Sequence, residues 1–236
     1  MKKKVKQAPK PHRILLQAIV NALQVIFTEN KYADKVIEKT LKENSKFGGR
    51  DRRFVAETTY DIVRNYRLLN HLTKNADNYW EILGAHFILK HIHLPPEREF
   101  KDLNEKAILD AQKALNNQAV LQSYPDWLWD LCSKELGAAQ WETEAKALNH
   151  QAKVVLRVNT LKTKKEILIK HLAEKEIEVD ATPDFNDALI LRERQNVFAN
   201  ELFKLGLFEL QDAGSQAISE FLEVEPGMRV IDACAG

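Results

Sequence analysis

Apolar residues recur at spacings of three and four through most of the first 150 residues. In the first of these runs the apolar positions form one helix stripe: Ile14, Leu15, Ala18, Ile19, Ala22, Leu23 and Ile26. The same periodicity predicts further helices at residues 32–42, 50–73, 77–90, 102–117, 125–136 and 138–149. We therefore expect a mainly helical domain over residues 14–150.

The pattern changes after Gln151. The next apolar residues alternate with more polar ones, as in a strand with one buried face: Val154, Leu156 and Val158. A capping box from Thr163 to Glu166 is predicted to open a helix through residue 173. Short strands are predicted after this helix at 177–179, 188–191 and 208–211. These elements predict a small α/β domain, ferredoxin- or RRM-like, over residues 151–210.

Residues 211–236 have the pattern that opens a nucleotide-binding sheet. They contain an amphipathic helix, a turn at Pro226-Gly227 and a predicted buried strand from Met228 to Ala233 that carries Asp232. The strand runs into a loop of small residues, and ligands of open α/β sheets lie beyond the carboxyl ends of such strands. We expect this segment to be the first helix and strand of a Rossmann-type domain.

The chain is almost neutral as a whole, but residues 1–13 are strongly basic. The net charge of the chain is +1, and this segment contains the following basic residues and no acid: Lys2, Lys3, Lys4, Lys6, Lys10 and Arg13. A flexible cationic arm attracts phosphate backbones by counterion release, without sequence selectivity. A solvated terminus with no binding role is the alternative.

Cysteine use and hydropathy indicate a soluble protein of a reducing compartment. Cys132 and Cys234 are too far apart for a metal-binding pair, and two cysteines are too few for a disulfide framework. No run approaches the roughly 20 consecutive apolar residues that span a bilayer. His86, His91 and His93 have no cysteine or carboxylate at a familiar ligand spacing, so we expect no bound metal. We expect a cytoplasmic location.

One arc of the predicted helix over residues 50–73 is rich in arginine. At 100° per residue four arginines fall within an arc of about 100°: Arg50, Arg53, Arg64 and Arg67. The adjoining arc is apolar. Glu57 lies inside the basic arc, so an RNA-binding stripe and a solvated, salt-bridged surface are both open at this point.

Ordered motifs along the chain resemble those of one enzyme family. Gln211-Asp212-Ala213-Gly214-Ser215-Gln216 is similar to a QDxxSQ motif, and Ile231-Asp232-Ala233-Cys234-Ala235-Gly236 to the strand and loop that follow it. Upstream, Tyr124-Pro125-Asp126-Trp127-Leu128 is similar to YPxWL, and Leu156-Arg157-Val158-Asn159-Thr160-Leu161-Lys162 to LRxNxxK. Residues 50–64 are similar to a helical NusB-like domain. On these motifs the chain resembles the Fmu/Sun/RsmB family of RNA cytosine-5 methyltransferases.

The resemblance implies an S-adenosylmethionine-dependent enzyme whose expected substrate is ribosomal RNA. Cys234, Ala235 and Gly236 match the first positions of the loop that holds S-adenosylmethionine. The helical domain is expected to be NusB-like and to bind RNA, with the four arginines as the candidate contacts. Arg157 and Asn159 share the less apolar face of their strand, and we expect them to contact RNA or to pack against the catalytic domain.

The residues that match the family stop within the cofactor loop. Gly236 stands where the family usually has a second alanine, which is a small-for-small change. In this family a cysteine beyond the loop attacks C6 of cytosine and activates C5, and another helps to release the product. Cys234 belongs to the cofactor loop and Cys132 to a helix stripe, so neither is assigned catalysis. Residues 1–236 alone are therefore expected to be inactive.

Two other functions stay open at this point. The first is a non-catalytic adaptor of the NusB type that binds RNA or protein. The second is a different nucleotide-binding enzyme, which would share the Asp232 strand. That enzyme would not explain the motif at Tyr124-Pro125-Asp126-Trp127 or the motif that begins at Gln211-Asp212.

Overall fold

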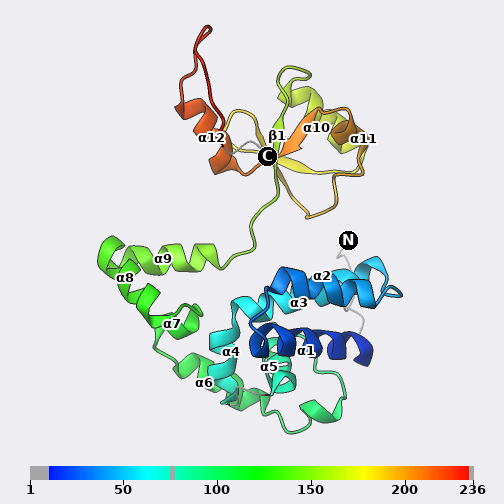
Figure 1. Cartoon of the computed structure of the whole chain (residues 1–236), viewed down its shortest axis with the longest axis vertical. Coiled ribbons are helices and arrows are strands. Elements are labelled where there is room, and N and C mark those ends of the chain that lie inside the picture. The colour runs from blue at the N-terminus through cyan, green and yellow to red at the C-terminus, as the bar shows by residue number, and fades with distance from the viewer. Residues whose placement is uncertain (1–10, 75–77, 234–236) are drawn as a thin grey trace, which may run out of the picture. The chain divides into compact units, whose positions relative to one another are not determined.

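The structure is a computed structural model that describes residues 11–74 and 78–233 and divides into two units. The first unit extends to His150 and the second starts at Gln151. Among its described residues the first unit is built from helices (Figure 1): α1 (Arg13–Thr28), α2 (Ala33–Glu43), α3 (Gly49–Arg64), α4 (Tyr66–Thr73), α5 (Tyr79–Leu89), the 3-10 helix η1 (Arg98–Phe100), α6 (Glu105–Ala114), α7 (Gln118–Leu121), α8 (Asp126–Leu136) and α9 (Ala138–Leu148).

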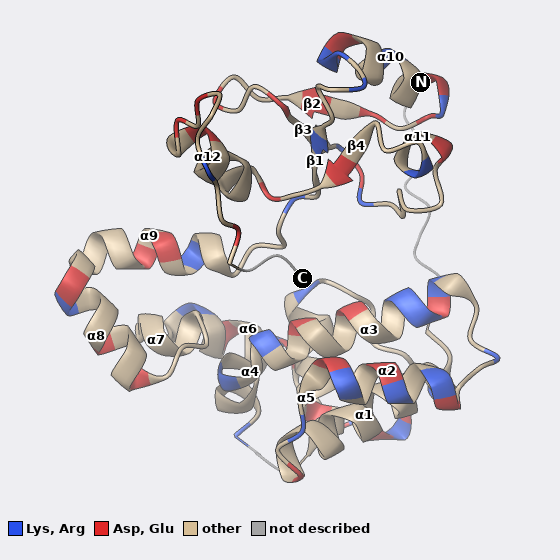
Figure 2. Cartoon of the chain, turned by 45° about the horizontal axis from the view of Figure 1, so that its top comes forward, with Lys and Arg blue, Asp and Glu red and all other residues tan. Residues whose placement is uncertain are grey.

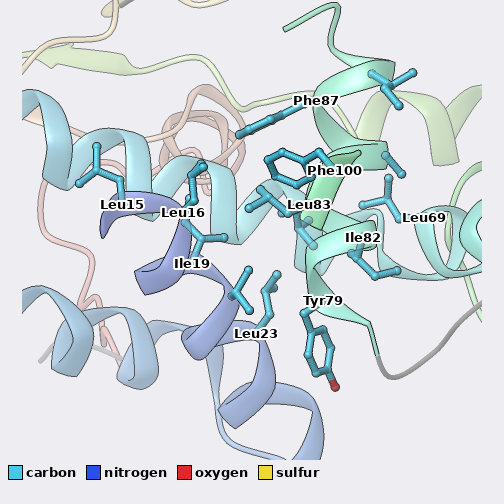
Figure 3. Close-up of a cluster of buried hydrophobic side chains, with 14 of the residues drawn as sticks. Leu15, Leu16, Ile19, Leu23, Leu69, Tyr79, Ile82, Leu83, Phe87 and Phe100 are labelled. Atoms are coloured by element: carbon cyan, nitrogen blue, oxygen red, sulfur yellow. The ribbon is translucent and has the colours of Figure 1, made fainter. Parts of the chain in front are cut away.

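Helix α5 lies at the centre of the first unit's core. Its sequence is apolar on all sides, and every residue from Ile82 to Ile88 is buried. α1, α3, α4 and α6 all contact it. Figure 3 shows the side chains that meet around α5: Leu15, Leu16, Ile19, Leu23, Leu69, Tyr79, Ile82, Leu83, Phe87 and Phe100. The helices around α5 are amphipathic, because they bury one face against it and turn the other to water.

The stripe predicted on the first helix is confirmed except at its first position. The other predicted positions are buried on α1: Leu15, Ala18, Ile19, Ala22, Leu23 and Ile26. Ile14 is 60% exposed. It lies in the first turn of α1, at the start of the stripe.

The single helix predicted over residues 50–73 is wrong. α3 ends at Arg64, Asn65 has φ −102° and ψ 16°, and α4 starts at Tyr66. The side-chain amide of Asn65 donates to the carbonyl oxygen of Asp61 at 2.8 Å, and the backbone N–H of Asn65 donates to the same oxygen at 3.0 Å. The spacing of apolar residues continues across the break, so periodicity alone does not reveal it.

The second unit contains a four-stranded antiparallel sheet. Its elements are β1 (Val155–Val158), α10 (Lys165–Glu174), β2 (Val179–Ala181), β3 (Ala188–Leu191), α11 (Glu201–Lys204), β4 (Phe208–Leu210) and α12 (Ala213–Phe221). The strand order is β2-β3-β1-β4, with Leu156 opposite both Leu189 and Leu210. This βαββαβ order is the predicted ferredoxin-like arrangement. Its core lies between the sheet and α10, with Leu168, Leu172 and Phe208 fully buried.

The second face of this sheet is partly covered. Successive strand residues point to opposite faces, so Val155 and Ala188 face away from the core formed with α10. Both are nevertheless buried, and α12 contacts β1 (Figure 2). Gln216 of α12 is also buried and donates to the Gln211 carbonyl at 3.0 Å. α12 therefore packs on the ferredoxin-like sheet.

Two local predictions in this unit are wrong. The predicted capping box at Thr163 is absent, and no side chain caps α10. The amides of Lys162 and Thr163 donate to the Asn159 carbonyl in a turn, and the N-cap of α10 is Lys164, one residue after the predicted one. Residues 228–233 form no strand, and Val230 and Ile231 are exposed by 58% and 89%. A buried parallel strand needs paired neighbours and a helix layer, and the described residues supply neither to this segment.

We predict that the first unit loses stability in mild acid because of His86. The imidazole is buried on α5, and burial lowers its pKa from 6.5 to about 4, although nearby Asp61 raises it. The unfolded chain takes up a proton as pH falls through 6.5, and the folded chain does so only near pH 4. The free energy of unfolding should therefore fall between pH 6.5 and pH 4, by up to about 3 kcal/mol.

Denaturant unfolding followed by tryptophan fluorescence measures this change, because Trp80, Trp127, Trp129 and Trp141 all lie in the first unit. His86→Leu should flatten the dependence on pH in that window. His71→Gln is the matched control, because His71 is exposed on α4. An unchanged pH slope in His86→Leu would show that another group is responsible.

Candidate RNA-binding site

The exposed face of α3 carries three of the four predicted arginines. Arg50, Arg53 and Arg64 are exposed, and within the described residues none of them forms an ion pair. Figure 2 shows the basic residues of α3 gathered at its two ends. The other face of the helix is buried through Val55, Thr58, Thr59 and Ile62. The core therefore holds the three guanidinium groups on the water side of α3.

The start of α3 is held by residues next to these arginines. The amide of Gly48 donates to the Asp51 carboxylate at 3.3 Å, and Arg52 donates to the Leu41 carbonyl at 2.8 Å. Arg52 thus ties α3 to the end of α2 and is not available as a surface cation. Arg50 and Arg53, on either side of it, have no ion-pair partner among the described residues.

Glu57 lies on the same face of α3 and is exposed. In the part of the chain that the structure describes, its carboxylate forms no ion pair with Arg53 or Arg64. The cations of the stripe are therefore not neutralised by the one acid among them, although that acid would repel a phosphate placed beside it.

Arg67 does not share this face. It lies on α4, beyond the break at Asn65, and its guanidinium donates to the carbonyl oxygen of Tyr124 and to Asp126, the latter at 2.7 Å. The ring of Tyr124 packs edge-on against Trp141, with ring centroids 5.3 Å apart. The placement of all four arginines on one helix is thus wrong, because Arg67 anchors the Tyr124-Pro125-Asp126-Trp127 motif to the helical core.

Arg64 has one weak internal partner. Its guanidinium lies 3.4 Å from the carbonyl oxygen of Asn149, at the end of α9, where the open carbonyls of a helix attract a cation. Asn149 in turn donates to the Gln122 carbonyl at 2.9 Å. Arg64 remains exposed and keeps donors free for a further acceptor.

Arg157 and Asn159 form hydrogen bonds inside the second unit. Arg157 donates to the side-chain oxygen of Gln211 at 3.0 Å, and Asn159 donates to the Gly206 carbonyl at 2.9 Å. Lys162, from the same motif, donates to the Leu205 carbonyl at 2.9 Å. The predicted RNA contacts at Arg157 and Asn159 thus have an internal role in the structure, and they join β1 to the chain around β4.

Sequence reasoning did not single out Lys162 or Gln211 in these roles. A motif lysine suggests a phosphate contact, whereas here it pairs an open carbonyl at the end of α11. The sequence signal that could have indicated this role is the glycine at position 206. In the structure Gly206 has φ +67°, and a Cβ atom on it would lie 2.7 Å from the Lys162 Nζ. Only glycine adopts this backbone conformation freely while leaving room for the ammonium group.

The sheet does not offer the aromatic surface on which RRM-type proteins stack bases. The residues on its second face are Val155, Arg157, Asp180, Ala188, Ile190 and Glu209. None of them is aromatic, and α12 contacts β1. Any RNA contact of this unit would therefore use its loops and exposed lysines.

The predicted cofactor residues Cys234, Ala235 and Gly236 lie outside the described residues. The chain just before them is exposed and carries Asp232. Cys132 is half-buried on α8. Among the described residues no group of His, Cys, Asp and Glu has the arrangement of a metal site. No helix in this part of the chain is both long enough and apolar enough to cross a membrane.

A comparison with protein families matches part of the chain. Residues 124–198 match the ferredoxin-like domain of RsmF/B-like methyltransferases. This match starts at the Tyr124-Pro125 motif and continues through β3. It thus covers α8, α9 and most of the sheet.

Curated relatives match a longer stretch. The probable ribosomal RNA small subunit methyltransferase B of Synechocystis is 24% identical over 254 residues, which is 90% of this chain and 56% of that protein. The ribosomal RNA small subunit methyltransferase B of Pseudomonas syringae is 31% identical over 122 residues, which is 50% of this chain and 26% of that protein. The chain thus spans about half the length of the first relative.

A solved structure has the same fold. The crystal structure of PH0851 superposes with a TM-score of 0.61 over 94% of this chain and 58% of that chain, at 20% sequence identity. The family match includes the motifs at Tyr124-Pro125 and at Leu156–Lys162. The resemblance seen in the sequence is therefore confirmed: the chain is similar to RsmF/B-like methyltransferases, over residues 124–198 by the family match and over most of its length by the first relative.

Proposed function

We propose that residues 1–236 form the RNA-binding part of an S-adenosylmethionine-dependent methyltransferase that modifies C5 of cytosine in ribosomal RNA. The order of the family motifs carries this proposal, together with relatives whose names are those of small-subunit ribosomal RNA methyltransferases. In this proposal the NusB-like domain over residues 14–150 binds RNA, the ferredoxin-like domain over residues 151–210 helps to present it, and residues 211–236 open the Rossmann-type methyltransferase domain.

The RNA assignment is supported by the unpaired cations of α3. Phosphate contacts fix the position of an RNA without reading its bases, and exposed arginines provide them. Arg50, Arg53 and Arg64 are exposed on one helix and have no acidic partner among the described residues. The basic arm predicted over residues 1–13 is proposed to add non-selective attraction through its lysines. Arg13 does not belong to this arm, because it starts α1 and forms ion pairs with Glu97 and Glu99.

The cofactor assignment rests on the motif. S-adenosylmethionine supplies the methyl group when bound, and Cys234, Ala235 and Gly236 are proposed to line its loop. Small residues allow the backbone of such a loop to approach a nucleotide closely. We propose a cytoplasmic location for the whole protein, where ribosomal RNA is available.

We predict that the triple variant Arg50→Gln, Arg53→Gln and Arg64→Gln weakens RNA binding to all sequences alike. The slope of log K against log salt should become shallower by up to about 2, because up to three phosphate contacts are lost. Fluorescence anisotropy of labelled ribosomal RNA fragments at two salt concentrations measures both quantities. Equal affinity and slope for the variant and the natural chain would remove α3 from the binding site.

The matched control removes the same charge from the neighbouring helix. Lys35, Lys39 and Lys42 of α2 are exposed but already lie near Asp34, Glu43 and Glu38. Replacing these lysines with glutamine should change binding little. A similar loss in both triple variants would indicate a response to net charge alone, without a site on α3.

We predict that Glu57→Gln strengthens RNA binding. The exposed carboxylate lies on the same face as the free arginines and repels a bound phosphate. Its removal should raise affinity about two- to five-fold at low salt, the range of exposed charge interactions. The same anisotropy titration measures this gain. Weaker binding by Glu57→Gln would mean that RNA approaches another surface.

We predict that residues 1–236 alone transfer no methyl group. Covalent activation of cytosine needs a positioned thiolate, and the two cysteines present lie in α8 and in the proposed cofactor loop. Incubation of the purified chain with ribosomal RNA and S-adenosylmethionine labelled in its methyl group measures transfer. Label in the RNA above the level of a protein-free control would overturn the assignment of Cys132 and Cys234.

A further inference from the structure

An exposed tyrosine lies within the arginine stripe of α3. Tyr60 is 45% exposed and sits one turn before Arg64 and two turns after Arg53. At 100° per residue, the residues of this face fall within an arc of about 80°: Arg50, Arg53, Glu57, Tyr60 and Arg64. The stripe therefore presents an aromatic ring between cations about 6 Å and 10 Å away along the helix axis.

The ring of Tyr60 has no partner in the part of the chain that the structure describes. Two other tyrosines of this unit pack their rings: Tyr66 stacks on Phe27 at 3.7 Å between centroids, and Tyr124 packs on Trp141. Tyr60 makes neither a ring contact nor a side-chain hydrogen bond among the described residues. An aromatic face held open between guanidinium groups is the arrangement with which proteins bind unpaired nucleotides.

We propose that an unpaired base stacks on the ring of Tyr60 while Arg53 and Arg64 bind the flanking phosphates, so that α3 binds single-stranded RNA. This inference rests on the RNA-binding role proposed above. Bases of a duplex are stacked on one another and closed to a ring on a convex helix surface. A duplex strand laid along α3 would also carry its regular phosphates past Glu57, whereas a single strand can cross the helix at Tyr60.

The test compares one RNA in two forms. A labelled single strand of mixed sequence and its duplex with the complement are titrated with the full chain at two salt concentrations. Tyr60→Ala should lose about tenfold in affinity for the single strand, because base stacking on an aromatic ring is lost. Its salt slope should stay that of the natural chain, because no phosphate contact is removed. Tyr60→Phe should bind like the natural chain.

Tyr32→Ala is the matched control, because Tyr32 is 82% exposed and lies outside the stripe, just before α2. It should leave affinity unchanged. The stacking inference is overturned if Tyr60→Ala binds the single strand as the natural chain does, if Tyr60→Phe loses as much as Tyr60→Ala, or if the duplex binds as tightly as the single strand. The RNA-binding role survives those results if the triple arginine variant still weakens binding, and it fails too if that variant has no effect.

Discussion

The burial of α5 is the constraint on which the first unit depends. A helix whose residues from Ile82 to Ile88 are all buried must be enclosed, and α1, α3, α4 and α6 contact it. Each of these helices buries one face against α5, and this determines which of its faces is exposed to solvent. The outward direction of the arginines on α3 is therefore set by Val55 and Ile62, which are fully buried on the opposite side.

The elements with strong periodicity were predictable, and those decided by single side chains were not. The stripe of α1 and the strand at Ala188–Leu191 follow directly from apolar spacing. The break at Asn65 depends on one amide that pairs with the Asp61 carbonyl, and it displaces Arg67 from the face predicted for it. Three of the four arginines could thus be placed from sequence, whereas Tyr60 was overlooked because a lone tyrosine has no distinctive pattern.

The motif residues of the second unit have internal partners that the sequence alone did not indicate. Arg157, Asn159 and Lys162 are polar and lie close together in sequence, which favours a binding surface. In the structure each donates a hydrogen bond to a group between Leu205 and Gln211. Backbone carbonyls at the ends of short helices and strands need donors, and a sequence does not reveal which carbonyls are open.

The position of α12 has a consequence for how the chain can be divided. Residues 151–210 were expected to be a complete small domain, yet α12 packs on their sheet from beyond that boundary. Without it, Val155 and Ala188 would lose their cover and present an apolar face to water. α12 is thus also a structural layer of the ferredoxin-like fold. A fragment cut to give a folded ferredoxin-like domain should therefore end after Phe221 and not at residue 210.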